Sequence, residues 1–91
     1  MEALLHKDAE KYLSRQNATD RKRVKDAIKD LEKEPSEGDI RPYEGSKDIL
    51  RLRVGNFRAL FKYEKDYILV THIESRGQAY KKKTKSKRGK N

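Results

Sequence analysis

Arginine side chains recur within one short stretch of this sequence, RLRVGNFRALFKY. Arg51 and Arg53 are separated by one residue, and Arg58 follows after the next turn signal. Farther along the chain stand Arg76 and Tyr80. A guanidinium group binds phosphate oxygens with two parallel hydrogen bonds and stabilises the added negative charge of a pentavalent transition state. A tyrosine beside it can hydrogen-bond or stack near an attacking ribose 2′-hydroxyl. This set of side chains is therefore suited to a phosphodiester.

When a ribose supplies the nucleophile, the reaction needs neither a metal nor a protein nucleophile, and its product carries a cyclic phosphate. Other chemistries find no support in the sequence. The two histidines, His6 and His72, lack the spacing of metal ligands. There is no cysteine, no Gly-x-Ser-x-Gly turn and no phosphate-binding glycine loop. We expect no metal or cofactor, and we expect His72 to be a packed or hydrogen-bonded strand residue.

The elements that position the arginines follow from the hydrophobic period, which changes to two beyond residue 48. Three antiparallel strands are predicted, over residues 49–54, 57–64 and 67–75. In the first of them the apolar residues share one face, and Arg51 and Arg53 share the other. Gly55 and Asn56 form a hairpin signal between the first two strands. If helices cover the apolar face, the arginines project from a face that is open to solvent.

Two helices are predicted before these strands, over residues 6–16 and 18–33. Asn17 has the character of an N-cap for the second helix, and Pro35 ends it. Residues 34–46 have the composition of turns throughout. Residues 2–5 are either a short first strand or the start of the first helix. The expected fold is α+β, with a two-helix hairpin packed on a small antiparallel sheet that contains a three-strand meander.

The composition limits the size and environment of the domain. Only 33% of the 91 residues are hydrophobic and 43% are charged, so we expect one domain with a small core. The sequence has no apolar run of the roughly 18 residues that a membrane helix needs. The absence of cysteine suits a reducing compartment. We therefore expect a soluble, cytoplasmic protein.

The net charge of +9 is concentrated at the end of the chain. Residues 81–91 hold seven of the 24 basic residues and none of the 15 acidic ones, so residues 1–80 have a formal charge of only +2. We expect a single domain over residues 1–80 and a flexible basic tail over residues 81–91. The tail is either a solubilising extension or, as we favour, an arm that contacts phosphates. Its first three residues are Lys81, Lys82 and Lys83.

Most of the chain resembles a known family. DILRLRVGNFRALFKYEKDYILVTHIESRGQAYKK resembles the signature region of the RelE/ParE superfamily of toxin–antitoxin toxins, in which a Y-R-L-R-V-G-x-Y-R hairpin precedes a closing H-R-x-x-h-Y motif. KDAEKYLSRQNATDRKRVKDAIKDLEKEP resembles the helix hairpin of that family. The resemblance covers residues 3–82. It implies a toxin that a cognate antitoxin neutralises within a hetero-oligomer.

The two branches of the superfamily imply different activities. RelE proteins are messenger-RNA endonucleases that cut codons in the ribosomal A site and so inhibit translation. ParE proteins share the fold, inhibit DNA gyrase and lack the nuclease residues. By position, Arg58 matches the arginine that stabilises the transition state, Arg76 the arginine near the leaving group, and Tyr80 the tyrosine that orients the nucleotide. Arg51 and Arg53 match basic strand positions that contact phosphate.

Because all five residues are present, the resemblance favours a metal-independent, ribosome-dependent endoribonuclease. Its implied partners are the ribosome, messenger RNA and an antitoxin. A ParE-like gyrase inhibitor and a non-enzymatic RNA-binding module remain the alternatives.

The sequence departs from the family at the position of the general base. Ile49 and Arg51 stand where some relatives have lysines, one of which is a proposed base. Arginine, with a pKa above about 12, is a poor base. Ser75 stands where many relatives have a histidine. We predict none of the histidine–carboxylate pairs found in certain other relatives, because His72 comes too early to match. Proton removal is expected to fall to Tyr80, to water or to ribosomal groups.

Overall fold

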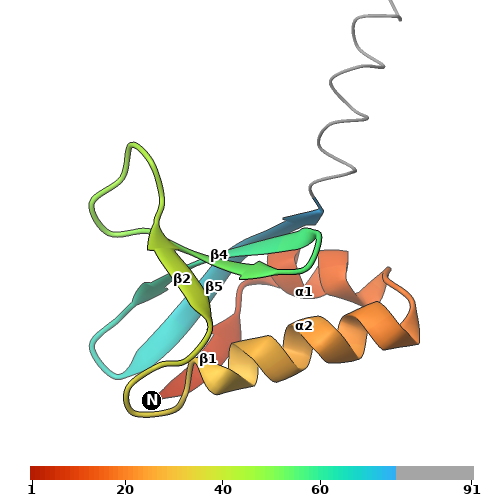
Figure 1. The fold of residues 1–91 in the computed structure, drawn as a ribbon, viewed down its shortest axis with the longest axis horizontal. Helices are drawn as coiled ribbons and strands as arrows, with labels where there is room; N and C mark the ends of the chain where they lie inside the picture. Colours follow the sequence, from red (N-terminus) through yellow and green to blue (C-terminus); the bar gives the residue numbers. More distant parts are fainter. Residues whose placement is uncertain (76–91) are drawn as a thin grey trace, which may run out of the picture.

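The computed structural model describes residues 1–75, so Arg76, Tyr80, the basic tail and the predicted domain boundary lie outside the described residues. The order of elements is β1 (Glu2–Leu5), α1 (Lys7–Ser14), α2 (Ala18–Asp30), β2 (Asp39–Pro42), β3 (Leu50–Val54), β4 (Phe57–Tyr63) and β5 (Tyr67–Ser75). The α+β class is confirmed, with both helices preceding the meander (Figure 1). Within residues 1–75, neither helix has the length and apolar character needed to cross a membrane.

The sheet has five strands in the order β1-β5-β4-β3-β2. The predicted meander of β3, β4 and β5 is confirmed, with antiparallel pairing throughout. Residues 2–5 form a strand, β1, and it runs parallel to β5. The sheet is therefore mixed, which corrects the expectation of a purely antiparallel one. A parallel edge strand is possible here because α1 and α2 lie in the connection between β1 and the rest of the sheet.

β2 was not predicted, because its segment has the composition of a turn. It forms because Ile40 faces the core and lies opposite the buried Leu52 of β3. β2 is the edge of the sheet, where Pro42 can end the strand without removing a central hydrogen bond. This short strand brings Arg41 onto the sheet, beside Arg51.

Both helices are shorter than predicted. The predicted N-cap of α2 is confirmed, since the Asn17 side chain accepts a hydrogen bond of 2.8 Å from the Asp20 amide. α2 ends at Asp30, three residues before the predicted end. The amides of Leu31, Glu32 and Lys33 bond carbonyls three residues earlier, so the chain tightens and leaves the α-helical path.

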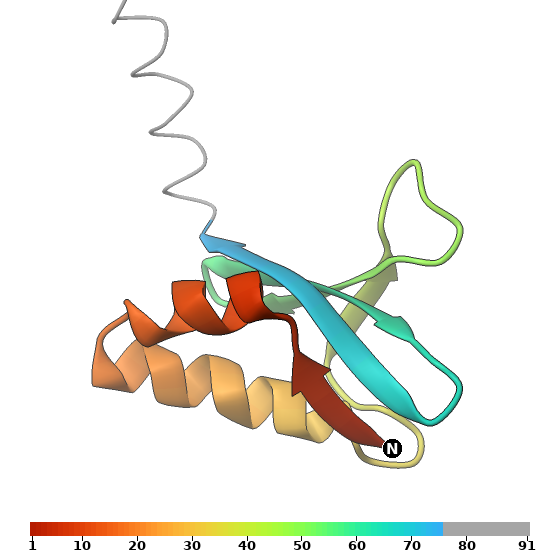
Figure 2. The same ribbon diagram turned by 180° about the vertical axis from the view of Figure 1, so that it is seen from behind.

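The core lies between the helices and one face of the sheet (Figures 1 and 2). The helices contribute aliphatic side chains, and Phe61 of β4 is fully buried against them. The buried hydrophobic residues are Ala9, Leu13, Val24, Ile28, Leu31, Leu52, Phe57, Ala59, Phe61, Ile68, Val70 and Ile73. No helix of the described chain covers the opposite face of the sheet, which we call the open face. The arginines of β3 and β4 belong to this face.

Candidate functional site

The strand register gathers arginines from three strands on the open face. Arg41 of β2 lies opposite Arg51 of β3, and Arg53 of β3 lies opposite Arg58 of β4. Each pair brings like charges together across neighbouring strands, an arrangement that destabilises a sheet unless an anion relieves it. The predicted sharing of one face by Arg51 and Arg53 is confirmed, because Leu52 between them is buried. The sequence did not predict Arg41 as a site residue, because it did not predict β2.

Two adjoining hollows lie among these arginines. The larger, of about 700 Å³, is lined by Arg41, Arg51 and Arg58, together with Tyr43 and its neighbours in the loop that follows β2. The smaller, of about 320 Å³, lies between Arg51, Arg53, Arg58 and the β3–β4 turn. Arg51 and Arg58 line both. In Figure 1 the loop after β2 extends away from the sheet.

Arg51 has a donor that its surroundings do not satisfy. Its Nε atom is buried and has no hydrogen-bond partner in the described part of the chain. An unsatisfied buried donor costs about 1–3 kcal/mol. Arg51 lines both hollows, and a shift of its side chain would bring Nε to a phosphate oxygen bound in either of them.

Arg58 belongs to a cluster with two residues of β5. Its Nε donates a hydrogen bond of 3.0 Å to Oε2 of Glu74, and its Nη2 contacts the same oxygen. The other carboxylate oxygen, Oε1, lies 3.1 Å from Nε2 of His72. The expectation that His72 is a hydrogen-bonded strand residue is confirmed. The absence of a histidine–carboxylate pair is corrected, because His72 and Glu74 form one.

A β-bulge explains why sequence reasoning missed this pair. Leu60 pairs with His72 whereas Phe61 pairs with Val70, so β5 carries one extra residue, Thr71. Strict alternation from the buried Val70 would turn His72 and Glu74 toward the core and Ile73 toward solvent. The bulge reverses this, because it shifts the phase of the strand by one residue. The signal in the sequence is Ile73, an apolar residue out of phase with Val70.

The Glu74 carboxylate is held in its charged form. Partial burial raises the pKa of Glu74, but the hydrogen bonds and charges of Arg58 and His72 outweigh that effect and leave the pKa below its ordinary value. Glu74 is therefore ionised near neutral pH and fixes the orientation of both partners. An arginine has five N–H donors. Its bonds to Glu74 engage two of them, Nε–H and one on Nη2.

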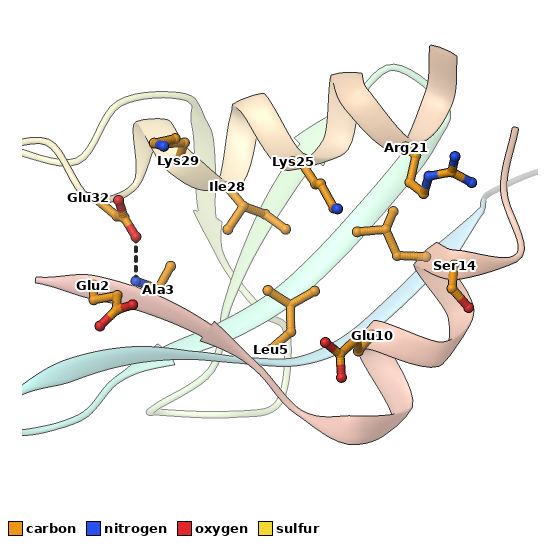
Figure 3. Close-up of a pocket in the computed structure, with 11 residues that line it drawn as sticks. Glu2, Ala3, Leu5, Glu10, Ser14, Arg21, Lys25, Ile28, Lys29 and Glu32 are labelled. Atoms are coloured by element: carbon orange, nitrogen blue, oxygen red, sulfur yellow. Dashed lines mark hydrogen bonds between the residues drawn. The ribbon is translucent and has the colours of Figure 1, made fainter. Parts of the chain in front are cut away.

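A second concavity lies on the helix side of the molecule, between β1 and the helix pair (Figure 3). It measures about 660 Å³. Leu5, Leu13 and Ile28 form its apolar floor, and charged side chains of β1, α1 and α2 form the rim. The amide of Ala3 donates a hydrogen bond of 2.7 Å to Oε2 of Glu32, so this backbone group of β1 points away from β5 and into the groove.

The remaining predicted site residues are not described. Arg76, Tyr80, Lys81, Lys82 and Lys83 lie outside residues 1–75, and their roles stay predictions. β5 ends at Ser75, directly after Glu74, so the described chain ends beside the Arg58 cluster. Within residues 1–75, no three His, Asp or Glu side chains gather in a way that would hold a metal ion.

Comparisons with known proteins agree with this fold. Over residues 4–80 the sequence matches the family described as ParE toxin of type II toxin-antitoxin system, parDE. The RelB–RelE antitoxin–toxin complex from Methanococcus jannaschii is a structural match with 26% identity and a TM-score of 0.69, over 86% of this chain and 95% of that chain. The archaeal RelE–RelB complex from Pyrococcus horikoshii OT3 matches in fold, with 24% identity, a TM-score of 0.67 and coverage of 84% and 94%. Comparison with curated proteins found no match.

Proposed function

This chain belongs to the ParE toxin family of type II toxin–antitoxin systems, within the RelE/ParE superfamily, and from the arginines of its open face we propose that it is a ribosome-dependent endoribonuclease. Its substrate is messenger RNA in the ribosomal A site. Cleavage proceeds by attack of a ribose 2′-hydroxyl on the adjacent phosphate and uses no metal. The product is a 2′,3′-cyclic phosphate, and the physiological effect is inhibition of translation.

The observation that carries this proposal is the arginine cluster of the open face. Arg41, Arg51, Arg53 and Arg58 surround two adjoining hollows, and the buried Nε of Arg51 has no acceptor in the described chain. Rigid neighbouring strands hold the guanidinium groups at fixed separations, which suits the recognition of one phosphodiester and its neighbours. No helix of the described chain covers the open face, so it is accessible to an extended strand of RNA.

We assign each of these residues a separate role in binding or cleavage. Arg58 stabilises the charge of the pentavalent phosphorus, and Arg51 and Arg53 bind the flanking phosphate oxygens. Arg76 acts near the leaving oxygen and Tyr80 orients the nucleotide, both as the family resemblance implies. Lys81, Lys82 and Lys83 add salt-dependent affinity for phosphates. The ribosome presents the message in one conformation, so that a small domain need not position it alone.

An antitoxin segment is the expected partner of the groove in Figure 3. The two structural neighbours are complexes of RelE with RelB. In this chain, the apolar floor of Leu5, Leu13 and Ile28 suits an amphipathic segment, and the mixed charges of the rim suit polar residues at its margins. Such a segment neutralises the toxin if its continuation covers the arginines or displaces the chain end that carries Tyr80.

The test is primer extension on a message threaded through purified ribosomes. The wild type is compared with Arg58→Ala, Arg76→Ala and Tyr80→Phe, and Lys22→Ala on the exposed surface of α2 serves as a matched control. We expect cuts at A-site codons with the wild type and the control, and a reduction of roughly 100-fold or more for each site variant. A message left intact by the wild type, with and without ribosomes, contradicts the nuclease proposal.

Inhibition of DNA gyrase is the second candidate. Two observations favour it: the family matched over residues 4–80 is named for ParE, and part of the charge of Arg58 is neutralised by Glu74. Three measurements distinguish the nuclease from the gyrase inhibitor. A gyrase inhibitor blocks supercoiling by purified gyrase, leaves messages intact, and retains toxicity when Arg58, Arg76 and Tyr80 are replaced.

A further inference from the structure

We propose that His72 is the general base that removes the proton from the attacking 2′-hydroxyl, and that Glu74 is the residue that positions it. This inference rests on the proposed nuclease function. It assigns to a described side chain the role that the sequence left to Tyr80, to water or to ribosomal groups, since Arg51 is too basic to accept a proton.

His72 lies near the arginines to which we assign phosphate binding. Its side chain is 52% exposed on the open face, and it is linked through Glu74 to Arg58, the arginine to which we assign the scissile phosphate. In the strand register, His72 lies directly opposite Leu60, and Leu60 lies opposite Arg51. His72 therefore stands on the same face and in the same cross-strand row as the arginine whose Nε has no acceptor.

The contact with Glu74 selects the tautomer of the imidazole. Glu74 is an ionised carboxylate and accepts hydrogen bonds, so the contact of 3.1 Å requires the proton to be on Nε2 of His72. The lone pair is then on Nδ1, which is available to accept a proton. The same carboxylate stabilises the imidazolium that forms after the transfer. This is the arrangement by which a buried or partly buried carboxylate orients a catalytic histidine.

The step can be written with all atoms balanced. Nδ1 of His72 accepts the proton of the 2′-hydroxyl as the 2′-oxygen forms a bond to phosphorus. The bond between phosphorus and the 5′-oxygen breaks, and the 5′-oxygen leaves with the electron pair and takes a proton from water. The products are a 2′,3′-cyclic phosphate and a 5′-hydroxyl end. The imidazolium then returns its proton to solvent.

The titratable groups nearest to His72 come from β4, β5, α1 and the end of β1, where the His6 amide donates a hydrogen bond of 2.8 Å to the Val70 carbonyl. Glu74 lies on its own strand and Arg58 on β4, while the residue directly opposite is the apolar Leu60. α1 packs on the other face and brings Tyr12 toward Glu74; burial is the main cause that raises the pKa of this phenol, and the Glu74 charge adds to it. The principal electrostatic partner of His72 is therefore Glu74.

A structural role for the cluster is the alternative, because Arg58 and Glu74 are opposite charges on directly paired strands. That role accounts for the ion pair but gives no part to His72, whose removal would leave the pair intact. The pH dependence of cleavage separates the two interpretations. An imidazole base titrates at about pH 6.5 when unperturbed, whereas a purely structural residue gives no inflection there.

The experiment measures single-turnover cleavage of ribosome-bound message between pH 5.5 and 8.5. It compares the full chain with His72→Gln, Glu74→Gln and the control His6→Gln, a histidine whose side chain accepts the Asp8 amide at the start of α1. For the wild type and the control, we expect the rate to rise tenfold per pH unit and then level off. His72→Gln should lose this inflection and about 100-fold or more in rate. Glu74→Gln should slow cleavage, because the imidazole loses the carboxylate that orients it.

The outcomes distinguish the inference from the proposed function. If the wild type cleaves and His72→Gln keeps both the wild-type rate and the inflection, His72 is not the base, although the nuclease function stands. If His72→Gln slows cleavage but retains the inflection, or loses affinity for the ribosome to the same extent, the inference is overturned in favour of a binding or structural role. If the wild type does not cleave, the proposed function fails and the inference falls with it.

Discussion

Arg53 and Arg58 lie directly opposite each other on β3 and β4, and each has an acid as its outer neighbour. Asp39 of β2 is paired with Arg53, and Glu74 of β5 is paired with Arg58. The row across the sheet therefore reads acid, arginine, arginine, acid. Glu74 forms an ion pair with Arg58, whereas the ion pair of Asp39 is with Arg41, so the space between Arg53 and Arg58 stays positive. A phosphate bound there would face both guanidinium groups.

The Arg53–Arg58 pair is expected to lower the stability of the fold and to strengthen the binding of RNA. Arg53→Gln removes a like-charge pair and should stabilise the fold by a few tenths to about 1 kcal/mol. The same change should weaken binding of single-stranded RNA and flatten its dependence on salt, because one phosphate contact is lost. Urea unfolding and binding titrations at two or more salt concentrations measure the two effects.

Lys47→Gln, in the exposed loop after β2, is the matched control for Arg53→Gln because it removes one positive charge away from a paired strand. It should leave the unfolding free energy within about 0.5 kcal/mol of wild type. Equal stabilisation by the two variants would mean that net charge, and not the Arg53–Arg58 pair, governs the effect.

The fold was predictable wherever local pattern and tertiary environment agree. The alternation of apolar and basic residues around Leu52 predicted the faces of β3, and the short polar side chain of Asn17 predicted the start of α2. β2 could not be read from its residues, because its strand conformation depends on pairing with β3 and on the packing of Ile40. Edge strands of this length carry little periodicity of their own.

The candidate site was predictable in part for the same reason. Arg51 and Arg53 follow from a strand of regular alternation and were placed on the open face from sequence, and Arg58 was assigned to the neighbouring strand. His72 and Glu74 depend on a bulge, which changes the side of the sheet on which every later residue lies. A bulge is set by how two strands fit together, and the sequence of one strand gives only an indirect sign of it.

The depressed pKa of Glu74 predicts a pH dependence of stability. A carboxylate whose pKa is lower in the folded state stabilises the fold above its unfolded pKa of about 4.5. That contribution is lost as the pH falls from there through the lower folded pKa. We expect it to amount to about 1 kcal/mol or less, because a partly exposed ion pair is screened by solvent.

Urea unfolding of the wild type and Glu74→Gln at pH 7 and at pH 3 measures this contribution. The variant should be the less stable protein at pH 7, and the difference should shrink at pH 3, because the stabilisation by the ionised carboxylate declines once the pH is below the unfolded pKa of about 4.5. A difference that is constant over this range would show that Glu74 acts through packing and not through its charge. Asp26→Asn, at an exposed ion pair on α2, serves as the control.

Asn17 should contribute to stability through the N-terminus of α2. Its side-chain oxygen accepts the Asp20 amide at 2.8 Å, which satisfies one of the amides that the helix leaves unpaired. Asn17→Ala should cost about 1 kcal/mol in unfolding free energy, whereas Asn17→Asp should retain most of the stability because aspartate caps equally well. Thermal unfolding of both variants tests the cap. Equal losses in the two would assign the effect to the amide nitrogen, which contacts Asp20 Oδ2 at 3.1 Å.

Gly38 should be needed to hold β2, and with it Arg41, in place. Its φ angle is +128°, and a Cβ atom there would lie 2.8 Å from Cδ1 of the buried Leu52. Gly45 also has a positive φ, +85°, but a Cβ atom would meet nothing within 4 Å. Gly38→Ala therefore adds a steric clash with the core to the backbone strain, whereas Gly45→Ala adds strain alone, about 1–2 kcal/mol. We expect Gly38→Ala to be the more destabilising by roughly 1 kcal/mol or more in urea unfolding.

Because β2 is anchored beside Leu52, Gly38→Ala should also weaken RNA binding to the extent that Arg41→Ala does. If Gly38→Ala and Gly45→Ala lose the same stability and both keep wild-type RNA affinity, then β2 does not depend on Gly38.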